Sequence, residues 1–214
     1  MVIDTAGTST ATRADSMMTI AADSSSQAQV APSAGIPAPV SGQPVPLAPI
    51  ATPGAAGSSN PSVVPADIPA LRRQAPAVPV AGVAADKLVD SFDEMRGGTR
   101  RHNAIDIMAA RNTPVVSVTA GRVLKLHNSV AGGLTLYASD ATNRYIFMYG
   151  HLDSYRPGLV EGATLKRGEV IGFVGSTGNA NPLGPHLHFV VTRSDNVKEW
   201  WKGTPINPYL VYRE

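Results

Sequence analysis

The chain has 214 residues, with 18 Lys and Arg against 16 Asp and Glu, a formal net charge of +2 and no cysteine. The lack of cysteine excludes disulfides and thiolate metal sites, and the small, scattered basic excess argues against a nucleic-acid interface. Residues 1–70 hold one basic against four acidic residues, whereas the rest holds 17 basic against 12 acidic residues. The C-terminal part is therefore suited to an anionic partner.

The N-terminal third differs in composition from the rest of the chain. Residues 1–80 hold 12 of the 18 prolines and no Phe, Trp or Tyr. Such a stretch has little apolar surface to bury against its ordering cost. We therefore predict a disordered, Pro/Ala-rich linker over residues 1–77 and one globular domain over residues 78–214.

The N-terminus shows neither an export signal nor a membrane span. Met1–Thr5 is not a basic region followed by an apolar core, and the apolar patch Met17–Ala22 is too short to cross a bilayer. We expect no integral membrane segment in this chain. A cytosolic protein and a mature or truncated form of an exported one both fit, and the tether-like linker favours the second.

From residue 78 onward the patterns predict β-structure. The segment 139–143 is turn-like and joins two strands of a hairpin, and helical signal is weak, with Ala84–Phe92 as the best short candidate. The prediction is an all-β fold, a compact antiparallel β-sheet domain with long loops at one end. Its strands are expected over residues 113–127 with a turn or bulge at Gly121, over 133–138, 144–149 and 186–192, and on both sides of a turn within 165–174.

Four of the five histidines, with one aspartate, form a pattern typical of a zinc site. They are His102, Asp106, His151, His186 and His188. Two nitrogen ligands and one carboxylate leave a fourth position open for water, which is the arrangement of a catalytic zinc. The pattern therefore predicts a hydrolase.

Strand geometry decides which of these side chains can meet. Residues i and i+2 of a strand point to the same face. His186 and His188 are therefore predicted to line one pocket while Leu187 faces the core, and Tyr149 is predicted to share a face with His151.

The pair His102 and Asp106 requires a bend. On a straight strand their Cα atoms would lie about 13 Å apart, too far for both side chains to reach one ion. We predict this bend at Asn103–Ala104.

Other features have simpler explanations. His127 has no partner motif and is expected to be structural. The Gly-rich segment 175–184 lacks the GK[ST] ending of a phosphate-binding loop. It is expected to be a tight connection that leads into the strand of His186. Trp200–Trp201 suits a carbohydrate or peptide platform, but packing that closes the domain is favoured. Among the basic residues, Arg101 is retained as a binding candidate because it adjoins His102.

Taken together, six segments resemble the lysostaphin-type (LytM-like) zinc metalloendopeptidases. The resemblance spans about residues 78–209 in the right order. It implies a substrate groove, hydrolysis of peptide stems or cross-links in bacterial peptidoglycan, and one Zn²⁺ per domain. The segments are His102-Asn-Ala-Ile-Asp-Ile, Thr113-Pro-Val, Tyr149-Gly-His-Leu, Lys166-Arg-Gly-Glu-Val-Ile-Gly, Gly175-Ser-Thr-Gly and Pro185-His-Leu-His-Phe.

The resemblance also assigns roles to residues. It implies that His102, Asp106 and His188 are the zinc ligands and that His151 and His186 are the catalytic pair. This ligand set is complete, which separates the chain from degenerate members that lose zinc residues and regulate other wall enzymes.

Two positions depart from the family pattern. The family commonly has Gly where this chain has Ala104, and a positive φ there would strain Ala by about 1 kcal/mol. Many members have Glu where this chain has Val190, on the face of His186 and His188, so a polar neighbour of the site is missing.

Several alternatives stay open. A non-catalytic module that binds the wall or activates a hydrolase is the first, and an endopeptidase of glycine-rich protein segments is the second. Specificity is expected to depend on three groove walls, over residues 96–101, 128–133 and 179–184. The function implies an extracytoplasmic location, in the periplasm or cell envelope, and we expect a monomer that acts on peptidoglycan peptides.

Overall fold

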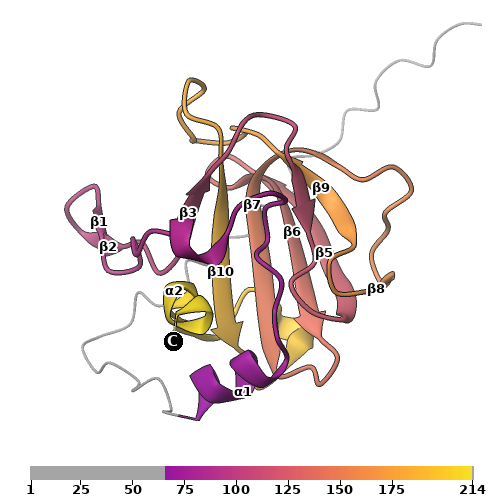
Figure 1. Ribbon diagram of the computed structural model, residues 1–214. Helices are drawn as coiled ribbons and strands as arrows, with labels where there is room; N and C mark the ends of the chain where they lie inside the picture. The colour runs from indigo at the N-terminus through magenta and orange to yellow at the C-terminus, as the bar shows by residue number, and fades with distance from the viewer. Residues whose placement is uncertain (1–65, 214) are drawn as a thin grey trace, which may run out of the picture. The chain divides into compact units, whose positions relative to one another are not determined.

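Within residues 66–213, the part of the chain that this computed structural model describes, nine strands form one antiparallel sheet. The predicted all-β antiparallel fold is thereby confirmed. The strands are β3 (Ile105–Met108), β4 (Pro114–Val116), β5 (Gly121–Ser129), β6 (Gly133–Asp140), β7 (Tyr145–Tyr155), β8 (Thr164–Leu165), β9 (Val170–Val174), β10 (His186–Arg193) and β11 (Thr204–Ile206) (Figure 1).

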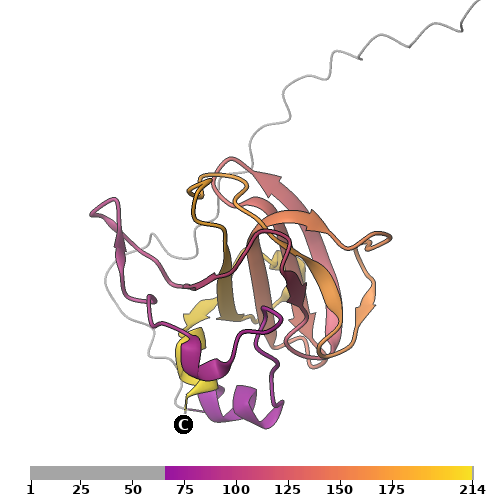
Figure 2. The same cartoon turned by 45° about the horizontal axis from the view of Figure 1, so that its top comes forward.

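The pairing of the strands determines which residues become neighbours. The main path of the sheet runs β11-β10-β7-β6-β5-β8, while β3 pairs with β10, and β9 pairs with β7 and β4. A separate ribbon, β1 (Met95–Arg96) with β2 (Arg100–Arg101), projects away from the sheet beside β3 (Figure 1, Figure 2). Since β10 lies between β3 and β7, His188 stands opposite both Asp106 and Gly150.

The core holds β10 firmly in this position. Leu187 and Phe189 are fully buried, and the ring of Phe189 stacks on Phe147 with the centroids 6.4 Å apart. Burying side chains of this size contributes roughly 1.5–3 kcal/mol each. The alternate residues of β10 therefore have a fixed orientation toward the other side of the sheet.

Most predicted strands are confirmed, with differences at their ends. β6, β7 and β10 correspond to the strands predicted over 133–138, 144–149 and 186–192, and β8 and β9 flank the predicted turn. The long strand predicted over 113–127 is divided into β4 and β5. Gly121 begins β5 where the sheet is tight, because a Cβ there would lie 1.8 Å from the carbonyl oxygen of Ser139.

The helical predictions are less accurate. The helix predicted over Ala84–Phe92 is only a 3₁₀ turn, Ala85–Lys87, and a second such turn spans Val197–Glu199. Two short helices, α1 (Asp67–Arg73) and α2 (Pro208–Tyr212), were not predicted. Among the described residues, no helix has the length and apolar character that crossing a membrane requires.

Helix α1 falls within the segment predicted as linker. Leu71 is 1% exposed and belongs to the core. Asp67 is 1% exposed, accepts a hydrogen bond from Tyr145 Oη at 3.0 Å and forms an ion pair with Arg193 at 3.1 Å. The folded region thus begins before residue 78. Composition did not reveal this start, because two residues, Leu71 and Asp67, are enough to anchor the helix to the domain. Residues 1–65 of the predicted linker lie outside the described residues.

This anchoring predicts where the chain can be shortened. A chain starting at residue 78 loses Leu71 and Asp67, so its free energy of unfolding should fall by roughly 2–5 kcal/mol, the usual cost of removing one buried Leu. A chain starting at residue 66 is the matched control and should unfold like the full chain. Urea denaturation followed by circular dichroism measures the difference, and equal midpoints for the two shortened chains would contradict the role of α1.

Candidate metal site and groove

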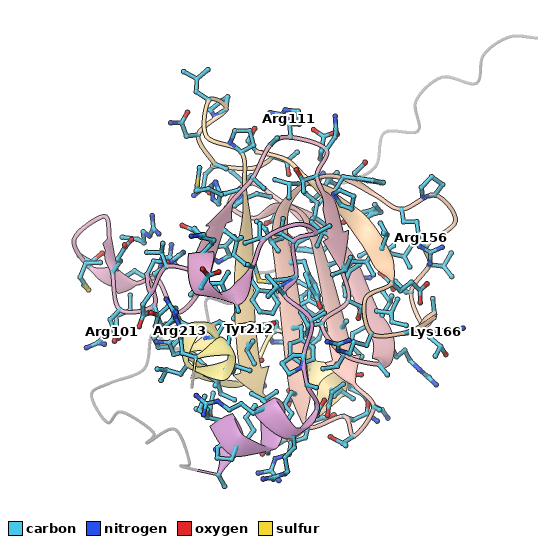
Figure 3. The ribbon with its side chains drawn as sticks, viewed as in Figure 1. Arg101, Arg111, Arg156, Lys166, Tyr212 and Arg213 are labelled. Carbon is cyan, nitrogen blue, oxygen red and sulfur yellow. The ribbon has the colours of Figure 1, made fainter. Side chains whose placement is uncertain are left out.

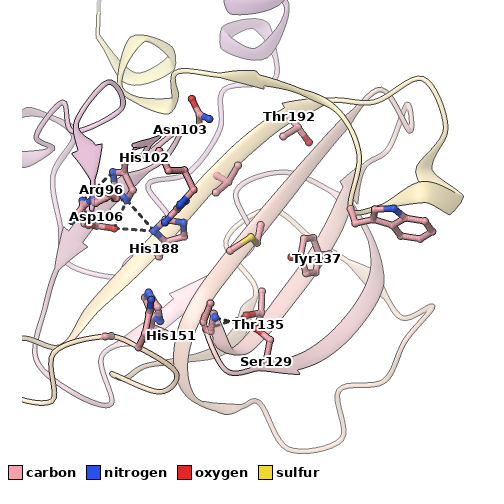
Figure 4. A pocket seen from close by; sticks show the side chains of 18 of the residues that line it. Arg96, His102, Asn103, Asp106, Ser129, Thr135, Tyr137, His151, His188 and Thr192 are labelled. Carbon is pink, nitrogen blue, oxygen red and sulfur yellow. Dashed lines mark hydrogen bonds and ion pairs between the residues drawn. The ribbon is translucent and has the colours of Figure 1, made fainter. Parts of the chain in front are cut away.

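Three side chains converge on one point beside β3 and β10. His102 precedes β3, Asp106 lies in β3 and His188 in β10. His102 Nε2 lies 3.1 Å from both His188 Nδ1 and Asp106 Oδ1, and His188 Nδ1 lies 3.0 Å from the same oxygen. Figure 4 shows the three side chains gathered at one end of a pocket. Two imidazole nitrogens and one carboxylate oxygen are a donor set that zinc prefers.

The bend between His102 and Asp106 is made by Asn103. Asn103 has a φ of 54°, in the left-handed region that Asn tolerates better than most residues. The chain then enters β3 with Asp106 directly opposite His188. The predicted bend is confirmed, but the strain expected at Ala104 is not present, because Asn103 and not Ala104 takes the positive φ.

A backbone carbonyl fixes the orientation of the His102 ring. Nδ1 of His102 lies 2.9 Å from the carbonyl oxygen of Ser91, and a carbonyl only accepts, so Nδ1 carries the hydrogen and Nε2 presents its lone pair. The Ser91 hydroxyl also accepts a hydrogen bond from the Asp106 backbone N–H at 3.2 Å. Such outer hydrogen bonds are usual for metal-binding histidines. The residues present therefore fit a zinc ion.

The protonation states of the three residues also suit a metal. Burial raises the pKa of Asp106, but its contacts with the His102 and His188 rings outweigh burial and hold this pKa well below its usual range. Arg96 Nη2 donates to Asp106 Oδ2 at 2.7 Å, while Oδ1 faces the two histidines. Burial lowers the pKa of His188. Metal binding requires an ionised carboxylate and a neutral imidazole, which the environments of Asp106 and His188 favour.

Two further histidines, His151 and His186, lie beside the three converging residues. Their ring centroids are 5.0 Å apart, and that of His151 is 5.5 Å from the ring of His188. Nδ1 of His151 donates to the carbonyl oxygen of Thr177 and Nδ1 of His186 to that of Gly184, both at 2.8 Å. Each ring therefore presents Nε2 as a proton acceptor.

Strand parity holds in β10 but fails in β7. In β10, His186 and His188 line the pocket while Leu187 is fully buried, as predicted. In β7, Tyr149 is fully buried, whereas His151 lines the pocket. The prediction that these two share a face is wrong, because His151 has a φ of 58° and lies where the pairing of β7 with β6 is irregular, so its side chain is turned over.

The burial of His151 predicts a pH dependence of stability. Burial first, and then repulsion from His188, lower the pKa of His151 from 6.5 to about 4. The folded protein thus binds fewer protons at this site than the unfolded chain, so stability is fully present above pH 6.5 and is lost as the pH falls toward about 4. The loss is about 3 kcal/mol at most.

Urea unfolding in the presence of a chelator, at pH 7.0 and pH 4.5, measures this effect without a contribution from metal release. We expect His151→Gln to lose less stability on acidification than the unsubstituted chain. Equal losses in the two proteins would show that the His151 environment does not disfavour its protonated form.

The converging residues occupy one end of a groove of about 540 Å³. Its floor is the open face of β6, β7 and β10, and Figure 4 shows Tyr137 across the floor from His188. Val190 belongs to this floor, as predicted. All three predicted wall segments contribute lining residues, namely Arg96 and Arg100, then Ser129, Ala131 and Gly132, then Asn179, Ala180 and Asn181.

Aromatic side chains form the other end of the groove. Trp200 packs on Tyr137 and His127, with ring centroids 4.5 Å and 5.6 Å apart, and Trp201 is 37% exposed. Trp200 therefore packs as predicted, and both tryptophans also line the groove. His127 does not line it.

Two arginines of the site could not be found by motif. Arg96 and Arg100 line the groove, whereas Arg101, the candidate chosen from sequence, forms an ion pair with Asp93 and does not. Arg96 and Arg100 face each other across the β1–β2 ribbon, a short element without hydrophobic periodicity. Adjacency to His102 was the wrong criterion, because Arg100 and Arg101 are consecutive residues of β2 and point to opposite faces of the ribbon.

The chain matches known proteins over the part that carries this site. A family model described as Peptidase family M23 matches residues 100–208. The L-Ala–D-Glu endopeptidase of Bacillus subtilis (strain 168) is 33% identical over 109 residues, which cover 49% of this chain and 33% of the relative. Lysostaphin of Staphylococcus simulans is 33% identical over 91 residues, which cover 41% of this chain and 17% of the relative.

A solved structure aligns over a similar part. The catalytic domain of the prophage-encoded M23 protein EnpA from Enterococcus faecalis matches with 26% identity and a TM-score of 0.47, covering 56% of this chain and 87% of that chain. The chain spans about a third or less of the length of the two curated relatives. The matched residues 100–208 include the three converging residues, His102, Asp106 and His188, and both further histidines.

Proposed function

The chain belongs to peptidase family M23, and on that premise we propose that it is a zinc-dependent endopeptidase that hydrolyses peptide stems or cross-links of bacterial peptidoglycan. The observation that carries the proposal is the convergence of His102 Nε2, Asp106 Oδ1 and His188 Nδ1 within about 3 Å of one another. In this proposal these three residues hold the zinc ion, and the domain needs no other protein for catalysis.

The histidines of the groove have two kinds of role in the proposal, metal ligand and proton acceptor. His102, Asp106 and His188 would hold the zinc ion, which would supply a Lewis acid to polarise the scissile carbonyl and acidify water. His151 or His186 takes up a proton at Nε2 and returns it to the leaving amine. The carbonyl oxygens of Thr177 and Gly184 keep these Nε2 atoms directed into the groove. Imidazole suits this task because its ordinary pKa lies near neutral pH. Burial lowers the pKa of His151 to about 4, so this ring is unprotonated and able to accept a proton at neutral pH.

The choice of substrate rests on similarity. The name of the Bacillus subtilis relative specifies an L-Ala–D-Glu bond, and D-amino acids are typical of peptidoglycan stems. The groove lies along the open face of the sheet, where an extended peptide could lie across β10, β7 and β6. A peptidoglycan substrate implies an extracytoplasmic location.

Digestion of purified peptidoglycan by the purified chain alone tests the proposal. We expect new peptide fragments in the soluble fraction, and mass spectrometry of these fragments identifies the bond. A chain that only binds the wall or activates a partner hydrolase would release nothing by itself. Release of fragments from glycine-rich protein but not from peptidoglycan would contradict the substrate while leaving the peptidase activity intact.

A further inference from the structure

The charges that line the groove are unbalanced. Its basic residues are Arg96, Arg100 and Lys202, and its acidic residue is Asp106, which belongs to the metal site. Two of the cations already have partners within the protein. Arg96 binds Asp106 at 2.7 Å, and Lys202 binds Glu199 at 2.6 Å. Among the described residues, Arg100 is therefore the groove cation that pairs with no carboxylate of the protein and can bind an anionic ligand.

The β1–β2 ribbon directs Arg100 into the groove. Arg100 pairs with Arg96 and Arg101 with Met95, so the two arginines of β2 lie on opposite faces of the ribbon. The Arg101 guanidinium pairs with Asp93, away from the groove, near the outer edge of the molecule (Figure 3). Arg100 is exposed, and among residues 66–213 no side chain forms an ion pair or hydrogen bond with it.

The pairing of Arg100 with Arg96 is a second reason to expect an anionic ligand at Arg100. Two like charges directly opposite on one face of a strand pair repel each other. Asp106 and Glu94 compensate Arg96, at 2.7 Å and 3.2 Å, but neither forms an ion pair with Arg100. An anion bound beside Arg100 would relieve this repulsion and could form two parallel hydrogen bonds with its guanidinium.

We propose that Arg100 is a specificity-determining residue that binds a free carboxylate of the peptide substrate, so that the groove selects acidic stem peptides over neutral glycine-rich bridges. The inference rests on the proposed function and names the substrate class within it. A glutamate carboxylate close to the scissile bond has the required charge and planar shape. A glycine bridge has only amides and leaves Arg100 without a partner.

Two stem peptides containing L-Ala–D-Glu test the inference, one with the glutamate carboxylate free and one with it amidated, with pentaglycine as a third substrate. We expect the zinc-loaded chain to cleave the free form with a kcat/KM about tenfold higher, the size of one charge-assisted hydrogen bond. The difference should appear mainly in KM and shrink as the salt concentration rises, because Arg100 is exposed.

Variants of the two arginines of β2 provide the comparison. Arg100→Ala should remove the preference for the free carboxylate, and Arg100→Glu should reverse it. Arg101→Ala, the matched control on the same strand, should keep it. Equal cleavage of the two stem peptides by the unsubstituted chain, or an unchanged preference in Arg100→Ala, would overturn the inference while leaving the endopeptidase activity standing.

A binding measurement separates this inference from the proposed function. Calorimetry with zinc-loaded His186→Ala, in which hydrolysis should be strongly reduced, compares the affinities of the two peptides with little turnover. We expect about tenfold tighter binding of the free carboxylate, abolished by adding Arg100→Ala. If the unsubstituted chain cleaves neither peptidoglycan nor any of the peptides, the proposed function fails. Equal affinities for the free and the amidated stem peptide would show that the carboxylate site fails as well.

Discussion

Asp106→Ala is expected to abolish both tight zinc binding and peptide release from peptidoglycan. Asp106 Oδ1 lies 3.1 Å from His102 Nε2 and 3.0 Å from His188 Nδ1, so its removal leaves two of the three converging donors. It also removes the nearer of the two carboxylates that pair with the Arg96 guanidinium, which stays next to the remaining histidines. A cation held beside a two-ligand site opposes the binding of a second cation.

Zinc content after gel filtration, measured by mass spectrometry, tests this expectation together with the peptidoglycan assay. Asp153→Ala is the matched control, because Asp153 forms an ion pair with Arg111 and does not line the groove. The control should keep one zinc per chain and full activity. Thermal unfolding of both variants distinguishes loss of metal from loss of the fold. A folded Asp106→Ala protein that keeps its zinc and activity would contradict the ligand assignment.

His186→Ala is expected to reduce hydrolysis by about 10²–10⁴-fold, the usual contribution of a general acid or base, while zinc stays bound. His186 Nε2 lies 3.9 Å from Asp106 Oδ1, farther than either proposed ligand nitrogen. Its Nδ1 is held by the carbonyl oxygen of Gly184, which makes His186 a positioned acceptor.

The control for this variant is His127→Ala, which removes an imidazole that packs on Trp200 outside the groove. It should retain zinc and near-normal kcat. The diagnostic result for His186→Ala is a lower kcat at unchanged zinc content, since a metal ligand would lose both together. An active His186→Ala protein would remove His186 from the proposed chemistry and leave His151 as the proton acceptor.

The part of the site that follows from local geometry was predictable from sequence. In β10 the period of two places His186 and His188 on one face, and the buried Leu187 and Phe189 lock that orientation. The need for a bend after His102 also follows from distance alone. Which residue bends the chain does not, because Asn103 and Ala104 are both possible and only the backbone shows that Asn103 takes the positive φ.

What sequence could not predict depends on long-range packing. His151 is turned into the groove by a positive φ at an irregular strand pairing, which no periodicity encodes. Helix α1 is too short to show a helical period, and it is fixed by contacts of Asp67 with residues far along the chain. Arg96 and Arg100 belong to a ribbon of two-residue strands, so their face became visible only from the pairing.

Zinc-dependent release of peptides from purified peptidoglycan is the decisive assay for a zinc endopeptidase. The purified chain is assayed with chelator, and then after chelator removal with zinc or with magnesium added. We expect release to stop with chelator and to return with zinc but not with magnesium, because two imidazoles and one carboxylate suit zinc and not a hard cation. Release that continues undiminished after complete removal of zinc would contradict the proposed function.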